Sequence, residues 1–217
     1  MIKNTFFIGL FTFFISSISF AEDPYAGQYK VLDFPEETTT SNGKVEVLEF
    51  FWYGCPHCSH IEAPLNNWLK TKADYIEFKR VPAVFHQTHG WAFGAKAYYI
   101  ADALDMLDTI HGAIFNAIHN SKPKQYDIIQ SKDGLRSFFE KHGVKAKKFN
   151  RVYRSFWIYK QLNTAVDTTA AYDLNGVPAI IVNGKYKLPG EKFSGYKNMM
   201  KVVDYLAAKE YQASNNK

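Results

Sequence analysis

Cysteine is scarce in this sequence: the 217 residues contain two, at positions 55 and 58. Two thiols are too few for a disulfide-stapled scaffold or for a zinc site with four thiolate ligands. The formal charge is +5, but there is no continuous block of Lys and Arg that would indicate a nucleic-acid surface. With 47% apolar and 22% charged residues the chain is not a disordered one. Its length is typical of one domain, or of one domain with an insertion.

Long apolar runs are also scarce, and the one that is present lies at the N-terminus. Lys3 precedes an apolar run over residues 6–15, and Ser19 and Ala21 stand at the −3 and −1 positions of a small-residue cleavage site. This pattern predicts a secretory signal peptide, residues 1–21. A membrane anchor is the alternative, but the run is short for a span of about 20 residues. We expect a mature chain of residues 22–217 with a charge of +4, no membrane span, and export to a compartment where disulfides persist.

Hydrophobic periodicity predicts an α/β protein. Val45 to Phe51 is a nearly continuous apolar run, which is typical of a strand buried on both faces. A helix should follow from residue 57, with Pro56 in its first turn and a kink at Pro64. Further expected elements are a short extended segment at 29–34, strands at 75–81, 179–182 and 185–188, an Asn183-Gly184 turn, and a last helix at about 194–211.

Helical spacing predominates from about residue 88 to 174, without a convincing strand. Helices are expected at 91–106, around 110–118, around 135–139 with a stop at Gly143, and from 149 to near 176. The cluster around Phe156 and Trp157 has helical spacing and is expected in the core. Five scattered histidines are expected on the surface or in capping positions: His86, His89, His111, His119 and His142.

The two cysteines lie where the buried strand meets the next helix, in the sequence Cys55-Pro56-His57-Cys58. Free backbone N–H groups and the helix dipole stabilise a thiolate at a helix N-terminus, and His57 adds a further dipole or positive charge. A stabilised thiolate favours the dithiol, so the corresponding disulfide is a strong oxidant. We expect Cys55 to be exposed and to be the sulfur that is attacked, and Cys58 to be its more buried partner.

Other interpretations of the motif remain open. One is a static Cys55–Cys58 disulfide, although so small a loop removes little chain entropy. Another is a metal site that uses both cysteines with His57 and His60, although structural zinc sites usually draw ligands from two separated pairs. A periplasmic metal-binding or holdase protein would also accommodate the motif, and it predicts an activity that survives Cys55→Ser.

The segments VLEFFWYGCPHC and NGVPAIIVNGKY, with the export signal and the helical segment between them, resemble the DsbA family of the thioredoxin superfamily. The resemblance covers about residues 28–211. It implies a thioredoxin-like fold with a central mixed sheet and a helical insertion at about 88–160. It also implies a monomer that needs no bound cofactor and no metal.

By the same resemblance, residues outside the CPHC motif carry roles. Val177-Pro178 matches a loop with a cis peptide bond that offers the backbone of Val177 to a bound peptide, an ordinary trans turn being the alternative. Glu49 matches a buried acid that assists proton transfer around the second cysteine, whereas spacing alone allows a Glu at the sheet edge. Glu62 matches a family acid more weakly, and a solvated helix residue is the alternative.

The function that the resemblance implies is a periplasmic oxidase, which donates the Cys55–Cys58 disulfide to newly exported proteins with free thiols. A quinone-linked membrane oxidase of the DsbB type would restore the disulfide. The nearest alternative is a reductase or isomerase of the same superfamily. Exported isomerases of this kind resemble dimers with a separate N-terminal domain, for which the residues before Val45 leave little room. Lys79 and Arg80 are expected to give local charge balance.

Overall fold

The computed structural model describes residues 23–216 apart from 42 and 194, so the expected signal peptide lies outside the described residues. The described strands form one mixed sheet in the order β1-β5-β4-β2-β3. Strand β2 (Val45–Phe51) pairs in parallel with β3 (Ile76–Pro82) and antiparallel with β4 (Ala179–Val182). Strands β5 (Tyr186–Pro189) and β1 (Lys30–Val31) extend the antiparallel side. The prediction of a central mixed sheet is confirmed.

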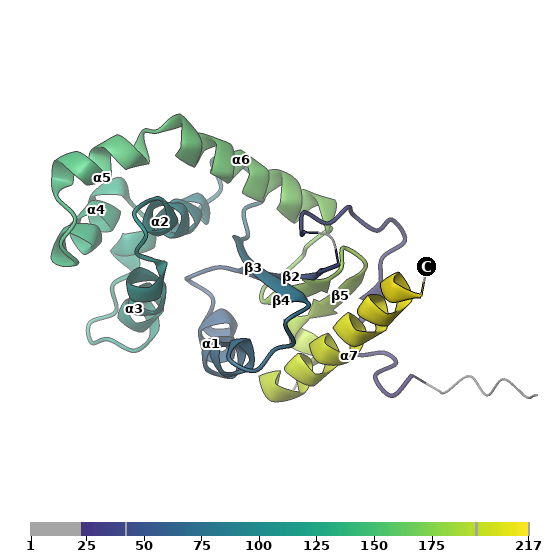
Figure 1. Ribbon diagram of the computed structural model, residues 1–217. Helices are drawn as coiled ribbons and strands as arrows, with labels where there is room; N and C mark the ends of the chain where they lie inside the picture. The colour runs from purple at the N-terminus through teal and green to yellow at the C-terminus, as the bar shows by residue number, and fades with distance from the viewer. Residues whose placement is uncertain (1–22, 42, 194, 217) are drawn as a thin grey trace, which may run out of the picture.

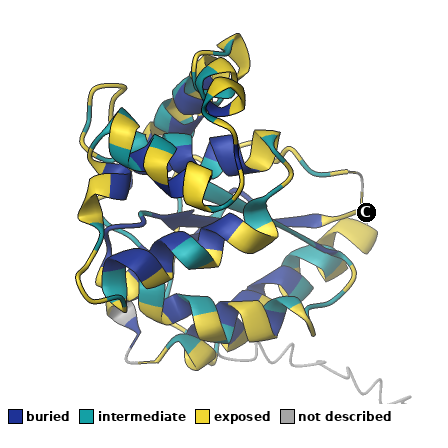
Figure 2. Ribbon diagram, turned by 90° about the vertical axis from the view of Figure 1, so that its left-hand side faces the viewer, coloured by how far each residue is buried: buried dark blue, intermediate teal, exposed yellow. Residues whose placement is uncertain are grey.

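Both faces of the sheet are covered, which explains why every residue of β2 is buried. Helices α1 (Pro56–Leu69) and α7 (Tyr196–Asn215) pack together on one face, where Val47 and Ile180 join their core (Figure 1). On the other face, Phe50 and Ile181 pack with residues that include Tyr172. Burial follows the inner faces of the helices, and exposed residues lie on their outer faces (Figure 2). Helix α1 continues through Pro64 to Leu69.

A block of helices separates β3 from β4 in the chain and packs beside the sheet (Figure 1). Its α-helices are α2 (Ala92–Ala103), α3 (Leu107–His119), α4 (Lys132–Lys141), α5 (Ala146–Tyr153) and α6 (Phe156–Ala171). A 3-10 helix, Tyr126–Ile129, lies between α3 and α4. Helix α6 runs back from the far end of the block to the sheet, and so crosses the expected boundary of the insertion near residue 160.

The prediction of one helix from residue 149 to near 176 is wrong. The chain leaves the helical conformation at Ser155, and its side chain accepts a hydrogen bond from the Ile158 N–H at 3.3 Å, which caps a new helix. The expectation of a core position is also wrong for Phe156, which is 78% exposed, and for Trp157, which is 37% exposed. Helical spacing indicates which residues share a face, but it does not indicate whether that face meets another element.

Two predicted turns are confirmed. Gly143 has a φ of +88° directly after α4 and its C-cap residue, a conformation that glycine adopts without steric cost. Asn183 and Gly184 have φ values of 53° and 64° in the three-residue connection between β4 and β5, where the N–H of Lys185 donates to the carbonyl of Val182 at 3.0 Å. A Cβ on Gly184 would lie 2.1 Å from the carbonyl oxygen of Glu36, so that turn also needs glycine for space.

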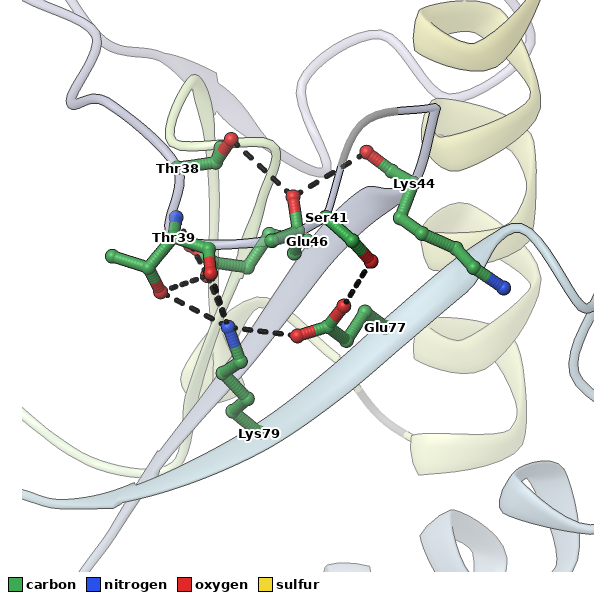
Figure 3. A network of polar contacts seen from close by, with 8 residues as sticks. Thr38, Thr39, Ser41, Lys44, Glu46, Glu77 and Lys79 are labelled. Atoms are coloured by element: carbon green, nitrogen blue, oxygen red, sulfur yellow. Dashed lines mark hydrogen bonds and ion pairs between the residues drawn. The ribbon is translucent and has the colours of Figure 1, made fainter.

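A polar network fixes the segment that precedes β2 (Figure 3). Glu46, which is buried, accepts hydrogen bonds from the backbone N–H and the hydroxyl of Thr39, at 3.2 and 2.8 Å. Lys79 of β3 lies 3.1 Å from Glu46 and 2.9 Å from Glu77, and Ser41 donates to Glu77. Lys79 therefore balances charge on the β2–β3 surface and does not belong to the cysteine site.

Candidate active site

The end of β2 and the start of α1 position the two cysteines. Cys55 is the N-cap of α1 with an extended backbone (φ −85°, ψ 119°), and Pro56 occupies the first turn, where its missing N–H costs no hydrogen bond. The N–H of Cys55 donates to the carbonyl of Trp52 at 3.0 Å, which closes the loop between strand and helix. The N–H groups of His57 and Cys58 point out of the helix end, where they have no intrahelical acceptor.

The surroundings of the two thiols give them opposite acidities. The pKa of Cys55 is lowered to about 6, chiefly by a hydrogen bond with the Cys58 thiol, and further by the backbone N–H groups of Cys58 and His57 and the charge of His57. Burial acts against this and is the weaker effect. The pKa of Cys58 is raised well above its ordinary value, first by burial and then by Cys55.

The expectation about exposure holds for one cysteine and needs correction for the other. Cys58 is 0% exposed, and Cys55, expected to be exposed, is only 9% exposed. Part of the reason is the loop before β4, because the Cys55 thiol donates to the carbonyl of Val177 at 3.3 Å.

The Val177–Pro178 peptide bond is cis, as the resemblance implies. The N–H of Gly190, after β5, donates to the carbonyl of Pro178 at 2.8 Å. A Cβ on Gly190 would lie 2.7 Å from that same carbonyl oxygen, so glycine permits the close approach that fixes the loop. The sequence offered no reason to single out Gly190, because its partner lies in another segment of the chain.

Three charged side chains meet beneath the cysteines. Glu49 of β2 is fully buried, and Arg80, its register neighbour on β3, places Nε 3.0 Å from the Glu49 carboxylate. Arg80 also lies 3.5 Å from Glu62 of α1, which is mostly buried and thus not a solvated residue. Arg80 therefore bridges Glu49 and Glu62, the two acids that the family resemblance singles out.

Burial controls the protonation of Glu49. It raises the pKa of Glu49 to about 8, with Arg80 opposing and the nearby charge of Glu62 adding to the rise. The ion pair with Arg80 is close but poorly aligned, and neither carboxylate oxygen has a hydrogen-bond partner among the described residues. Glu49 in turn contributes to the raised pKa of Cys58. A proton on Glu49 is therefore available near neutral pH.

A second group of polar residues, missed in the sequence, holds the loop before Cys55. The Tyr53 hydroxyl lies 2.8 Å from Nδ1 of His111 in α3, and Nε2 of His111 lies 3.3 Å from Glu62. His111 is buried, contrary to the expectation of a surface position, and burial lowers its pKa. A neutral His111 accepts from Tyr53 and donates to Glu62. His119 of α3 donates from Nε2 to the Tyr53 carbonyl at 2.7 Å.

Aromatic side chains border the same loop. Trp52 stacks on Trp91, with ring centroids 4.5 Å apart and an angle of 9° between the planes. The two rings line a cavity of about 530 Å³, together with Tyr126, Ile129 and two further residues. Trp52 lies three positions before Cys55, so this cavity borders the loop that carries the cysteine.

The metal site considered for His57 and His60 with the two cysteines has no support in the arrangement of the histidines. His57 is exposed, and its ring lies 6.3 Å from that of His60. Among the described residues there is no group of three or more His, Cys, Asp and Glu side chains that could hold a metal ion. Within residues 23–216, apart from 42 and 194, no helix has the length and apolar character needed to cross a membrane.

Comparison with known proteins gives consistent matches. Residues 74–207 match the family described as the DSBA-like thioredoxin domain. The chain is 35% identical over 184 residues to the thiol:disulfide interchange protein DsbA of Burkholderia cepacia, covering 84% of each chain. It is 33% identical over 195 residues to the protein of that name from Pseudomonas aeruginosa, covering 89% of each.

Solved structures agree with the sequence matches. The crystal structure of Pseudomonas aeruginosa DsbA has a TM-score of 0.77 and 32% identity, and covers 87% of this chain and 94% of that one. The crystal structure of reduced DsbA1 from Neisseria meningitidis has a TM-score of 0.73 and 29% identity, covering 88% and 97%. These likenesses extend over the sheet and the helical block together.

Proposed function

Because this chain belongs to the DsbA family and is a thiol:disulfide oxidoreductase of thioredoxin-like fold, we propose that Cys55 and Cys58 are its redox pair and Cys55 is the attacked sulfur. One observation carries the assignment: the pKa of Cys55 is lowered to about 6 while that of Cys58 is raised. The thiol with the lower pKa is the better leaving group, so it is the one that releases a substrate.

The proposed reaction transfers two electrons from substrate to enzyme. A substrate thiolate attacks the Cys55 sulfur, the Cys55–Cys58 bond breaks, and Cys58 leaves and takes up a proton. The substrate's second thiolate then attacks its own sulfur in the mixed disulfide. Cys55 departs as a thiolate, and the substrate carries a new disulfide. The substrates are proteins with free thiols.

Glu49 and Glu62 have supporting roles in this proposal. Cys58 must gain a proton when it leaves and lose one when the pair is reoxidised, and its burial makes both steps costly without a local partner. Glu49, with a pKa raised to about 8, supplies or accepts that proton. Glu62 sustains the raised pKa of Glu49 by its charge and connects it with His111.

Substrate binding is proposed at two surfaces beside Cys55. The backbone of Val177, next to the cis Pro178, offers a hydrogen-bonding edge to an extended peptide. The cavity lined by Trp52, Trp91 and Tyr126 accepts an apolar side chain of an unfolded substrate. Pro56 and His57, which are exposed at the start of α1, form the remaining border of the opening.

The setting of this reaction is also proposed. Residues 1–21 direct export to the periplasm, where the mature chain acts as a monomer without a bound cofactor. A quinone-linked membrane oxidase of the DsbB type restores the Cys55–Cys58 disulfide. A reductase would require a strongly reducing pair, which the stabilised Cys55 thiolate opposes.

Trapping tests the order of attack. Cys58→Ala, first treated with glutathione disulfide so that Cys55 carries glutathione, should exchange the glutathione for a reduced, unfolded substrate and accumulate the mixed disulfide with Cys55, because the return attack by Cys58 is lost. Cys55→Ser should abolish disulfide transfer. Non-reducing electrophoresis followed by mass spectrometry of the linked peptide identifies the sulfur. A glutathione redox titration of the wild type should give an oxidising potential. Trapping on Cys58 in Cys55→Ala, or activity that survives Cys55→Ser, contradicts the proposal.

A further inference from the structure

A corner of the helical block, residues 141–160, has a composition that the thiol chemistry does not use. It contains seven Lys or Arg residues and no Asp or Glu. All seven are exposed, and no ion pair among the described residues includes any of them. They are Lys141, Lys145, Lys147, Lys148, Arg151, Arg154 and Lys160. We call residues 141–160 the α5–α6 corner.

Aromatic rings lie among these cations. Phe156 is 78% exposed, Tyr159 is 52% exposed and Trp157 is 37% exposed. The rings of Phe156 and Tyr159 lie 6.3 Å apart, and Lys160 follows at the spacing that places it on the same face of α6. The core of the corner is filled by other residues, since Phe149 is 0% and Ile158 is 1% exposed. Phe156 and Tyr159 are thus not needed to fill the core, whereas Trp157 packs its ring edge-to-face with Tyr99, with ring centroids 6.2 Å apart.

The position of the corner leaves it accessible. Helix α5 and the first turns of α6 form the end of the molecule that is farthest from α7 (Figure 1). Lys147, Arg151 and Arg154 are spaced at four and three residues, so they project along one side of α5 and the link to α6. Exposed cations and exposed aromatic rings therefore occur together in one short segment of the chain.

We propose that the α5–α6 corner docks on a membrane surface that contains anionic lipid. Lys and Arg are attracted by the negative potential of such a surface, and Phe, Trp and Tyr enter the boundary between head groups and acyl chains. An acidic protein surface would complement the cations, but a mostly exposed Phe side chain surrounded by cations fits an interface with both charge and an apolar phase. Docking would hold the enzyme at the membrane, which on the proposed function is where its reoxidase lies.

Vesicle sedimentation tests this with the whole chain after removal of residues 1–21. Vesicles of phosphatidylcholine alone are compared with vesicles that contain about 30% phosphatidylglycerol. The protein should sediment with the anionic vesicles only, and about 0.5 M salt should release most of it because the charges are then screened. An absence of binding to anionic vesicles, or equal binding to both, overturns the proposal.

Matched variants separate the corner from net charge. Lys147→Glu/Arg151→Glu should lower the partition coefficient at least about tenfold, and Phe156→Ser about fivefold. Lys197→Glu/Lys201→Glu makes the same charge change at exposed positions of α7 and should stay within about twofold of the wild type. Equal loss in both charge pairs, or no effect of Phe156→Ser, contradicts docking by this corner. Unfolding midpoints and disulfide transfer in solution should match the wild type for all three, so a binding loss is not a folding loss.

Discussion

At the scale of single residues, two cysteines of one motif acquire different chemistry from their surroundings. Cys55 occupies the N-cap, where backbone N–H groups converge, whereas Cys58 lies one turn into α1 and is wholly buried. The hydrogen bond between the thiols lowers the pKa of one and raises that of the other. The position of Cys55 at the helix end therefore favours this sulfur as the leaving group. The backbone N–H groups supply part of the lowering of its pKa, and this part does not depend on the side chain at position 57.

The contribution of the His57 side chain can be measured separately. His57→Ser removes its charge but keeps the backbone N–H, so the pKa of Cys55 should rise from about 6 and remain below the ordinary value of 9.0. The disulfide should become less oxidising, by about 30 mV for each tenfold change in the equilibrium constant with glutathione. Thiolate absorbance against pH gives the first quantity and a redox titration gives the second. An unchanged pKa and potential would remove His57 from the site.

At the scale of secondary-structure elements, α3 of the helical block holds the loop that carries Cys55. His111 contacts the Tyr53 side chain and His119 contacts the Tyr53 backbone, so one helix fixes the residue two positions before the cysteine. His111 also reaches Glu62 of α1. Helix α3 thus contributes to the active site by positioning the loop, without supplying a sulfur.

A double-mutant cycle tests this connection. Phe at position 111 leaves the Tyr53 hydroxyl and one bond of Glu62 unsatisfied, so His111→Phe should lower the free energy of unfolding by about 2 kcal/mol. Tyr53→Phe should cost less, and the double variant should cost little more than His111→Phe alone, because both partners are then apolar. Urea unfolding of the four proteins gives the coupling energy. Strictly additive losses would show that the two side chains act independently.

The same elements show how far sequence reasoning reaches. Strand β2, helix α1 and the hairpin were predictable because their signals are local: a continuous apolar run, a proline in the first turn and an Asn-Gly pair. Glu49 and Pro178 followed from motifs of the family. His111 and Gly190 could not be found in this way, because their partners are distant in the sequence. Arg80 was expected to balance charge locally, but its two acidic partners could not be identified for the same reason. The break at Ser155 was missed because the helical periodicity continues across it.

At the scale of the whole molecule, the redox pair lies where the two halves of the fold meet. Cys55 and Cys58 belong to the apolar cluster of the helical block, together with Phe51 and Tyr53 at the end of β2, and not to the clusters that cover the sheet. The structure describes the dithiol form. Since the chain has no other cysteine, both redox states must be held by the same core.

The relative stability of the two states should therefore depend on one thiolate. The disulfide closes a ring of only four residues, so its constraint on the unfolded chain adds only about 2 kcal/mol of stability, and this amount does not change with pH. In the dithiol form, the pKa of Cys55 is about 6 when folded against an ordinary value of 9.0. A lowered pKa stabilises the folded state above the unfolded pKa, and this stabilisation is lost as the pH falls through about 6. Cys58 adds almost no slope up to pH 8, because its thiol keeps its proton in the unfolded chain, where the ordinary pKa is 9.0, and in the folded chain, where the pKa is raised.

We accordingly expect the Cys55 thiolate to favour the dithiol form over the disulfide form by about 2 kcal/mol at pH 8, once partial solvent screening of the thiolate is allowed for. This contribution to the difference should shrink steadily as the pH is lowered and nearly vanish at pH 5, where Cys55 is protonated, so the dithiol form should lose about 2 kcal/mol relative to the disulfide form between pH 8 and pH 5. Groups such as Glu49 titrate in both forms, so their contributions to the free energy of unfolding largely cancel when the two forms are compared. Urea unfolding of each form at intervals between pH 5 and 8 measures it. A difference that does not change with pH would mean that strain or packing around the sulfurs, and not the Cys55 thiolate, makes the disulfide an oxidant.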